Sequence, residues 1–255
     1  MGMLDGKRLL ITGVLTEASL AFATARLAQA EGAEVVLTGA GRALSITQRT
    51  AKKLEGPPPV HELDVSVREH AEALRTTLAE DYGRIDGALH SIGFAPPSCI
   101  ANPFMEAPWE DVATAIHVSA YSLKTLADVV IPCMPDGGSI VGLDFDSTLA
   151  FPEYNWMGVA KSALESTSRY LARTLGPRKI RVNLVSAGPI KTMASKAIAD
   201  FSDWEETWDQ RAPLGWSLRD NSGVAKACVA LLSDWFPQTT GELLHVDGGY
   251  HAMGA

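Results

Sequence analysis

Short apolar runs alternate along the chain with longer segments in which apolar residues recur at helical spacing. The first run, from Lys7 to Thr12, ends at Gly13, and the periodic segment from Ser19 to Glu31 follows it. Runs of this kind predict strands, and the periodic segments predict the helices that connect them. The other expected strands cover residues 33–38, 60–63, 86–91, 139–143, 181–185 and 243–246, and the other expected helices cover residues 67–82, 109–131, 154–175 and about 222–232.

Strands that alternate with helices build βαβ units, so this order predicts an α/β fold with a mostly parallel sheet. About seven parallel strands are expected, in a doubly wound arrangement with helices on both faces. No low-complexity linker or internal repeat divides the chain. Residues 1–255 are therefore expected to form one domain.

Glycines and polar residues gather at the ends of the expected strands. Sheets of this kind bind their ligands at the carboxyl ends of the strands, where the strand order reverses. The pattern therefore predicts a binding site along one edge of the sheet. The residues that follow or end six of the strands are Gly13, Gly39, Asp64, Ser91, Asp144 and Gly188.

Tyr154 and Lys161 are seven residues apart within an expected helix. Seven steps of about 100° come within about 20° of two full turns, so both side chains share one face, roughly 10 Å apart along the axis. A phenol that donates a proton and an ammonium that stays charged suit a site where negative charge develops on oxygen. The pair alone also fits a half-buried tyrosine and a surface lysine on an amphipathic helix.

A dinucleotide site would place three glycines between the first strand and the first helix, but only Gly13 is present. Glu17 and Ser19 stand at the other two places, and Ser19 can still cap the helix and offer a hydroxyl and an N–H group to phosphate. After the second strand, Arg42 suits a 2′-phosphate or simply lies in solvent. Asp64 suits either an adenine amino group or the N-cap of the next helix.

Composition and charge exclude several kinds of partner. Hydrophobic residues make up 46% of the chain and charged residues 20%, as in globular proteins. The formal net charge is −8 and no run of Lys or Arg stands out, which argues against nucleic acid and anionic membranes. No stretch resembles a membrane helix or a secretory signal. Cys99, Cys133 and Cys228 fit no zinc or disulfide spacing, so we expect no metal site and a cytoplasmic location.

Several motifs follow one another along nearly the whole chain. They are Ser19-Leu20-Ala21, Leu63-Asp64-Val65, His90-Ser91-Ile92-Gly93, Gly138-Ser139-Ile140-Val141, Gly142-Leu143-Asp144-Phe145-Asp146, Tyr154-Asn155-Trp156-Met157, Lys161-Ser162-Ala163, Ala187-Gly188-Pro189-Ile190-Lys191-Thr192, Trp208-Asp209-Gln210-Arg211 and Val246-Asp247-Gly248-Gly249. In this order they resemble the enoyl-acyl-carrier-protein reductases, a divergent branch of the short-chain dehydrogenase/reductase family. The likeness is closest to the mycobacterial type, and it implies a Rossmann-type fold.

The spacing of tyrosine and lysine separates the branches of that family. Ordinary short-chain ketoreductases use Tyr-x3-Lys and a serine at the end of the fifth strand. None of the five tyrosines here has a lysine four residues on, and the fifth strand ends in Leu143-Asp144-Phe145. Both absences favour enoyl reduction over a reductase that acts on a ketone or another enone. A nucleotide-binding sensor without turnover is the other alternative, although a sensor has no need of the Tyr154 phenol.

The resemblance implies hydride transfer from NADH, preferred over NADPH, to the β-carbon of a trans-2-enoyl thioester. The thioester is carried by acyl carrier protein or CoA, and the reaction ends the type II fatty-acid elongation cycle. Tyr154 would donate to the thioester oxygen and Lys161 would hold the nicotinamide ribose, as the catalytic pair, while Phe145 and Met157 would line the substrate pocket. The implied cofactor-binding residues are Gly13, Ser19, Leu20, Asp64, Val65, Ser91, Ile92, Gly93, Lys161, Ile190 and Thr192.

Two departures from the mycobacterial members change what we expect. A substrate lid at about residues 192–212 is shorter here and offers less wall for a very long acyl chain, so ordinary fatty-acid intermediates are the expected substrates. Ala40 stands where those members have an aromatic residue over the adenine, so weaker NADH affinity is expected. The resemblance also implies a homotetramer, with residues 247–255 near an interface.

Overall fold

The computed structural model describes residues 2–100, 102–193, 195, 201 and 203–254. Within these ranges, seven strands form one sheet in the order β3-β2-β1-β4-β5-β6-β7, and every neighbouring pair is parallel. The predicted doubly wound, Rossmann-type sheet is confirmed. The strands are β1 (Arg8–Thr12), β2 (Glu34–Gly39), β3 (Val60–Glu62), β4 (Gly87–His90), β5 (Gly138–Asp144), β6 (Ile180–Ala187) and β7 (Leu243–Val246).

The central strands are apolar runs because both of their faces are buried. Along β1, Leu9 and Ile11 belong to one hydrophobic core, while Leu10 between them belongs to the other. β2 pairs with β1 in register, with Val36 opposite Leu10, and repeats the same alternation. Since successive side chains point to opposite faces of a sheet, such runs need a helix layer on each side.

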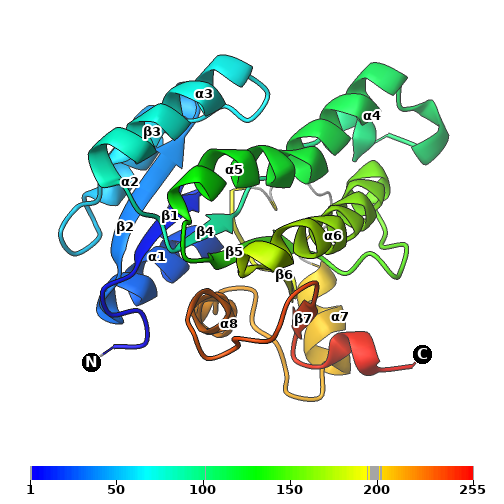
Figure 1. The fold of residues 1–255 in the computed structure, drawn as a ribbon. Coiled ribbons are helices and arrows are strands. Elements are labelled where there is room, and N and C mark those ends of the chain that lie inside the picture. The colour runs from blue at the N-terminus through cyan, green and yellow to red at the C-terminus, as the bar shows by residue number, and fades with distance from the viewer. Residues whose placement is uncertain (1, 101, 194, 196–200, 202, 255) are drawn as a thin grey trace.

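Helices supply both layers (Figure 1). One core contains residues of α1 and α8, and the other contains residues of α3, α5 and α6. Among the helices that the structure describes, none is long and apolar enough to cross a membrane. The helices are α1 (Leu20–Ala30), α2 (Gly41–Ala51), α3 (Arg68–Thr77), α4 (Trp109–Ile116), α5 (Ser122–Val130), α6 (Asn155–Leu175), α7 (Asp203–Arg211) and α8 (Ser222–Leu232).

Two of the expected helices are present but are not continuous α-helices. The helix expected at 109–131 consists of α4, a π-helical turn at His117–Tyr121, α5 and a 3-10 turn at Ile131–Cys133. The helix expected at 67–82 consists of α3 and a π-helical turn at Leu78–Tyr82. A π-turn holds more residues than an α-turn and changes which side chains face the core, a shift that the apolar pattern does not reveal.

Two helices were not predicted. α2 buries mainly small and polar side chains, namely Thr47, Thr50 and Ala51, so it carries no apolar stripe. α7 lies inside the predicted lid region, where Trp204 and Trp208 are its buried aromatic residues. Residues 194, 196–200 and 202 of that region lie outside the described part of the chain.

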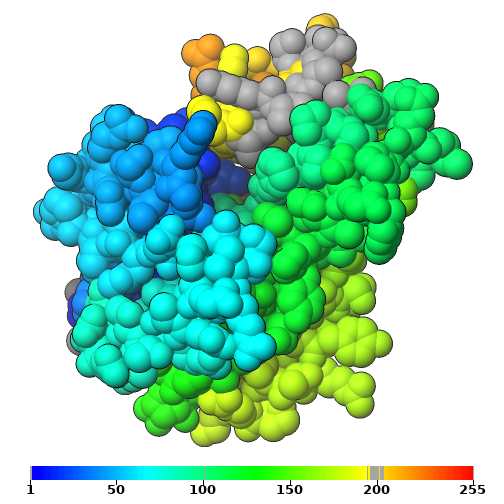
Figure 2. Space-filling model, turned by 90° about the horizontal axis from the view of Figure 1, so that it is seen from above, coloured from blue at the N-terminus to red at the C-terminus, as the bar shows by residue number. Residues whose placement is uncertain are grey.

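From β1 the sheet continues to β2 on one side, and from β4 it continues to β5 on the opposite side. The strand order therefore reverses between β1 and β4. Thr12 joins the two strand ends: its Oγ1 donates to the Leu89 carbonyl oxygen at 3.0 Å and accepts the Ser91 N–H group at 2.9 Å. Gly13 follows β1 at this point. Seen from above, the molecule has a hollow between its blue N-terminal part and its green middle part (Figure 2). Ligands of doubly wound sheets bind at such a reversal.

Candidate active site

Two adjoining cavities, of about 270 Å³ and about 660 Å³, open at the reversal point of the sheet. They form one cleft, because both are lined by Gly13, Leu15, Ser91, Ile92 and Gly93. Every residue that the sequence predicted for the cofactor or the substrate lines this cleft. Asp64 and Val65 line the larger cavity, and Ser19, Leu20, Phe145, Tyr154, Met157, Lys161, Ile190 and Thr192 line the smaller one.

Gly13 lies where two strand ends come too close for a side chain. Its φ is +80°, and a Cβ atom there would overlap the backbone carbonyl oxygen of Ser91. Glycine is the residue that adopts this backbone angle without strain and adds no atoms to the cleft. The single glycine of the first loop therefore has a local structural reason, whatever the cleft binds.

Ser19 occupies the N-cap position of α1 but does not cap the helix. Its hydroxyl donates to the Thr16 carbonyl oxygen at 2.6 Å, and its own N–H group donates to the same oxygen at 3.0 Å. The expectation of a side-chain cap is therefore wrong. Glu17, which stands in place of a second glycine, forms an ion pair with Lys53. The helix N-terminus still borders the smaller cavity through Ser19 and Leu20, and helix N-termini favour anions.

Asp64 faces the larger cavity and is not the N-cap of α3, a position that Val67 holds. Its Oδ1 accepts hydrogen bonds from the Ser66 N–H group at 2.9 Å and from the Ser66 hydroxyl at 2.5 Å. These bonds to Ser66 are the main reason that the pKa of Asp64 is lowered. The structure thus excludes the N-cap alternative and leaves a charged acceptor beside the cleft.

Tyr154 stands at the N-cap of α6, one residue before the helix begins. Both of its neighbours have left-handed backbone angles, with φ of +58° at Glu153 and +40° at Asn155. The Asn155 side chain fixes this turn, because its Nδ2 donates to the carbonyl oxygens of Ile100 at 2.8 Å and Asn102 at 3.1 Å. The position of the phenol is therefore set by a constrained turn rather than by regular helix geometry.

Lys161 lies two turns into α6 and is buried, with 8% of its surface exposed. Its Nζ donates to the Leu143 carbonyl oxygen at 2.9 Å and lies 3.7 Å from Oδ1 of Asp144. The interpretation of Lys161 as a surface residue is therefore wrong. Tyr154 and Lys161 line the same cavity.

Burial governs the charges around this pair. It raises the pKa of the Tyr154 phenol, and the Asp144 charge raises it further, so the phenol remains a proton donor. Burial lowers the pKa of Lys161, although Asp144 opposes this shift. Burial likewise raises the pKa of Asp144 to about 7, against the attraction of Lys161. The pKa of His90 falls to about 3, first through burial and then through the charge of Lys161.

Aromatic rings form one wall of the smaller cavity. Phe145 packs against Tyr154 and against Trp204 of α7, with ring centroids 5.0 Å and 5.5 Å apart. Trp208, one turn after Trp204, stacks on Tyr250 at 3.7 Å. Met157 is buried at the same cavity and also packs in a small core beside α4. The wall can accommodate an apolar ligand next to the phenol.

Sequence reasoning assigned no site role to Trp204 and no specific chemical role to Asp144. The spacing of Trp204 and Trp208, one helical turn apart, was the available signal that an aromatic helix face covers the site. Asp144 was noted only as a polar strand end, because the sequence alone does not show that Lys161 lies beside it.

The chain between residues 13 and 251 matches the sequence profile of the family described as Enoyl-(Acyl carrier protein) reductase. This chain belongs to the enoyl-acyl-carrier-protein reductase family. The family resemblance seen in the motifs is confirmed.

Relatives within this reductase family share the whole length of the chain. A protein of Mycolicibacterium smegmatis named enoyl-acyl-carrier-protein reductase (NADH) is 51% identical over 262 residues, covering 97% of both chains. The protein of that name from Mycobacterium avium is 47% identical, again over 97% of both. The reductase FabI of Aquifex aeolicus, also named for NADH, is 39% identical over all of this chain and 94% of its own.

Proposed function

We propose that this member of the reductase family reduces the 2,3 double bond of trans-2-enoyl thioesters with NADH. The thioesters are carried by acyl carrier protein or CoA, and the reaction completes the type II fatty-acid elongation cycle. The observation that carries the proposal is that Tyr154 and Lys161 line one cavity that continues into a nucleotide-sized cleft. The names of the relatives, which specify NADH and enoyl reduction, support it.

The cleft fits a dinucleotide on its own geometry. Gly13 leaves room at the strand ends, the N-terminus of α1 suits a pyrophosphate, and Asp64 suits the adenine amino group. NADH, when bound, supplies the hydride for the substrate β-carbon. The residues proposed to hold it are Gly13, Ser19, Leu20, Asp64, Val65, Ser91, Ile92, Gly93, Lys161, Ile190 and Thr192.

In the proposed reaction, hydride addition at the β-carbon leaves negative charge on the thioester oxygen, and a solvent proton then adds at the α-carbon to complete the reduction. The phenol of Tyr154 donates a hydrogen bond to that oxygen, and because burial keeps the phenol protonated, it is a donor throughout the physiological pH range. A donor that meets charge formed only in the transition state raises kcat rather than substrate affinity. Lys161 orients the nicotinamide ribose, and Phe145 and Met157 hold the acyl chain beside the phenol.

We propose ordinary fatty-acid intermediates, rather than very long chains, as the substrates. The alignment with the Mycolicibacterium smegmatis relative spans 262 positions and this chain has 255 residues, so at least seven positions of that relative have no counterpart here. The alignment with the Aquifex aeolicus FabI spans 256 positions and covers the whole chain. Turnover of chains beyond twenty carbons that equals or exceeds turnover of octenoyl to dodecenoyl thioesters would exclude this preference.

We propose NADH rather than NADPH because no arginine of the described residues lines the adenosine end of the cleft after β2. Arg42 is exposed and is not part of the lining, which is formed there by Gly39, Ala40 and Ala43. An NADP site would place a basic side chain against the 2′-phosphate. Ala40 contributes a single methyl group to the adenine side of the cleft, which supports the expected modest affinity for NADH.

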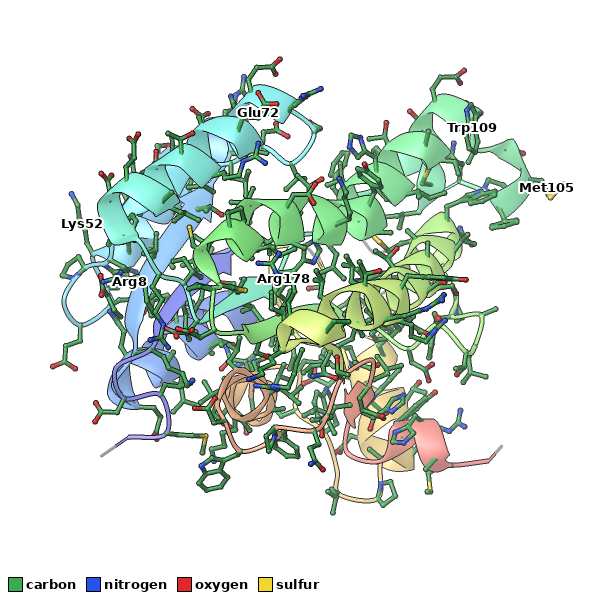
Figure 3. The ribbon with its side chains drawn as sticks, in the orientation of Figure 1. Arg8, Lys52, Glu72, Met105, Trp109 and Arg178 are labelled. Carbon is green, nitrogen blue, oxygen red and sulfur yellow. The ribbon has the colours of Figure 1, made fainter. Side chains whose placement is uncertain are left out.

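We further propose that the chain is a single domain with a lid at about 192–212 and that it assembles as a homotetramer. Large apolar residues are exposed on the helices beyond the sheet, including Trp109 (69%) and Tyr170 (67%). Met105 and Trp109 point away from the body of the molecule (Figure 3). Light scattering is expected to give four times the chain mass of 27.2 kDa. The buried free thiols of Cys99, Cys133 and Cys228 support a cytoplasmic location, which cell fractionation tests.

The decisive experiment follows NADH oxidation with a trans-2-dodecenoyl thioester, for the wild type beside Tyr154→Phe. We expect the variant to lose on the order of 10²–10³ in kcat while it binds NADH as before. Tyr170→Phe, on the exposed side of the same helix, is the matched control and is expected to behave as wild type. Absence of turnover by the wild type with both NADH and NADPH, despite nucleotide binding, would reject the proposal.

A further inference from the structure

Asp144 lines the smaller cavity, and its carboxylate is buried there without a well-placed hydrogen-bond donor from the described part of the chain. Its side chain has no exposed surface, and among the described residues no donor meets either oxygen in good hydrogen-bond geometry. The Phe145 N–H group and the Lys161 ammonium lie close enough to oppose the rise of its pKa without satisfying the carboxylate. The Nζ atom of Lys161 is 3.7 Å from Oδ1, which is beyond hydrogen-bond distance. A buried carboxylate left without donors is costly, so a site of this kind is expected to gain donors from its ligand.

Lys161 has the complementary shortage. Its ammonium carries three N–H groups and no acceptor, and Leu143 accepts one of them. The ammonium can therefore donate to the oxygens of a ligand hydroxyl but cannot receive the hydroxyl hydrogens. Two neighbouring hydroxyls on a sugar present acceptors and donors together, and they need both kinds of partner.

We propose, on the basis of the proposed function, that Asp144 and Lys161 bind the vicinal hydroxyls of the nicotinamide ribose as one donor–acceptor pair. Lys161 donates to the hydroxyl oxygens, and the two free oxygens of Asp144 accept the hydroxyl hydrogens. Asp144, the last residue of β5, is thus a cofactor-binding residue.

The charged groups near Asp144 give this pair a pH dependence. Lys161 and Glu165 approach from α6, and Tyr154 approaches from the residue before that helix. His90 lies on the adjacent strand β4 and stays neutral. Glu165 accepts a hydrogen bond from the Ser147 hydroxyl at 2.5 Å and forms an ion pair with Arg169 at 3.7 Å. Because Arg169 pairs with Glu165, Lys161 is the cation that compensates the charge of Asp144. Since burial raises the pKa of Asp144 to about 7, its carboxylate is lost below neutral pH. NADH affinity is therefore expected to weaken as the pH falls below 7.

The test compares Asp144→Asn with Asp146→Asn in the full chain. Asp146 is equally buried, two residues further on, and its Oδ1 accepts the N–H group and hydroxyl of Thr148, contacts that asparagine preserves. Binding of NADH and of adenosine diphosphate is measured by titration, without substrate, between pH 6 and 8. Adenosine diphosphate carries the adenosine and both phosphates but lacks the nicotinamide ribose, so it reports every other part of the cleft.

We expect Asp144→Asn to weaken NADH binding roughly tenfold or more at pH 8, because it loses a charged acceptor, and to bind adenosine diphosphate normally. Its NADH affinity should also lose the pH dependence of the wild type, which a general disturbance of packing would not produce. Asp146→Asn should match the wild type with both ligands. Unchanged NADH affinity in Asp144→Asn, or equal losses for the two ligands, would overturn the proposal.

A measurement on the unaltered chain guards against misfolding of the variant. Nitrogen NMR of the Lys161 ammonium without ligand should show a second inflection near neutral pH as Asp144 gains its proton, and a titration without it would also overturn the pairing. These readouts need no enoyl substrate. If NADH binds through Asp144 as expected but the enoyl thioester is not reduced, the proposed reaction is rejected and the proposed role of Asp144 stands.

Discussion

The ring of Phe145 meets the ring of Tyr154 at an interplanar angle of 60°, with their centroids 5.0 Å apart. The other sides of Phe145 are covered by Trp204 and by Phe151, whose centroids lie 5.5 Å and 4.9 Å away. Edge-to-face contact of this kind restricts the tilt of both rings. The direction of the Tyr154 hydroxyl therefore depends on a residue that has no polar atom of its own.

Phe145→Ala is expected to lower both stability and kcat. Loss of this buried ring should reduce the free energy of unfolding by about 3 kcal/mol, measured by urea denaturation. It should also lower kcat, because the phenol is no longer held at one angle, while NADH affinity stays within about twofold. Phe236→Ala, which removes a ring that is 40% exposed, is the control: it should cost less stability than Phe145→Ala and leave kcat unchanged. A stable Phe145→Ala variant with wild-type kcat would show that the ring does not orient the phenol.

Gly13→Ala is expected to weaken NADH binding strongly. The added Cβ meets the Ser91 carbonyl oxygen, and the left-handed backbone adds strain of about 1–3 kcal/mol. Gly6→Ala separates these two effects, since Gly6 has a similar φ of +74° but no atom within 4 Å of the place that a Cβ would take. Both variants should lose some stability, and Gly13→Ala alone should lose NADH affinity. Equal behaviour of the two variants in a binding titration would contradict a steric role for Gly13.

Asn155 should act on catalysis through the turn that holds Tyr154. Asn155→Ala loses two hydrogen bonds and forces alanine to adopt a φ of +40°, which together should cost about 2–3 kcal/mol of stability. Asn155→Gly loses the same bonds without the backbone strain and should be the more stable of the two. Both should lower kcat with little effect on NADH affinity. An alanine variant as stable as the glycine variant in thermal unfolding would argue against strain at this position.

His90 should make the protein sensitive to acid. The Ser122 hydroxyl donates its one hydrogen to the Val118 carbonyl oxygen at 2.6 Å, so the 2.7 Å contact between Ser122 and His90 requires His90 Nε2 to donate. The ring is fully buried and neutral, and its pKa is lowered to about 3 from an ordinary 6.5. Between about pH 3 and pH 6.5, His90 therefore binds a proton in the unfolded chain but not in the native chain.

The stability provided by neutral His90 is therefore complete above pH 6.5 and is lost as the pH falls toward 3. We expect a slope of about 1.4 kcal/mol per pH unit in this window from this one residue. His90→Gln can still donate to Ser122 but cannot titrate, so its unfolding free energy should fall less steeply with acid. Parallel pH profiles for the wild type and the variant, measured by urea denaturation, would exclude His90 as the acid-sensitive group.

The sequence predicted the strands of this fold well because buried parallel strands are continuous apolar runs bounded by glycine and polar residues. It missed α2 because Thr47, Thr50 and Ala51 bury a helix face without any large apolar side chain. Tyr154 and Lys161 line one cavity, although Tyr154 lies one residue before α6 and so outside the helix that their spacing predicted. The sequence could not show that Lys161 is buried or that Asp144 lies beside it, since those facts depend on how the end of β5 meets α6.

The two ends of the Tyr154–Lys161 segment are anchored to different parts of the chain. Asn155 and Trp156 tie the first turn of α6 to the backbone at Ile100, Asn102 and Phe104, whereas Lys161 is tied to β5 through Leu143. Mutations around Phe104 can therefore change the acyl side of the cleft without moving the ammonium. We therefore expect substitutions at the two ends of this segment to affect substrate range and cofactor affinity separately.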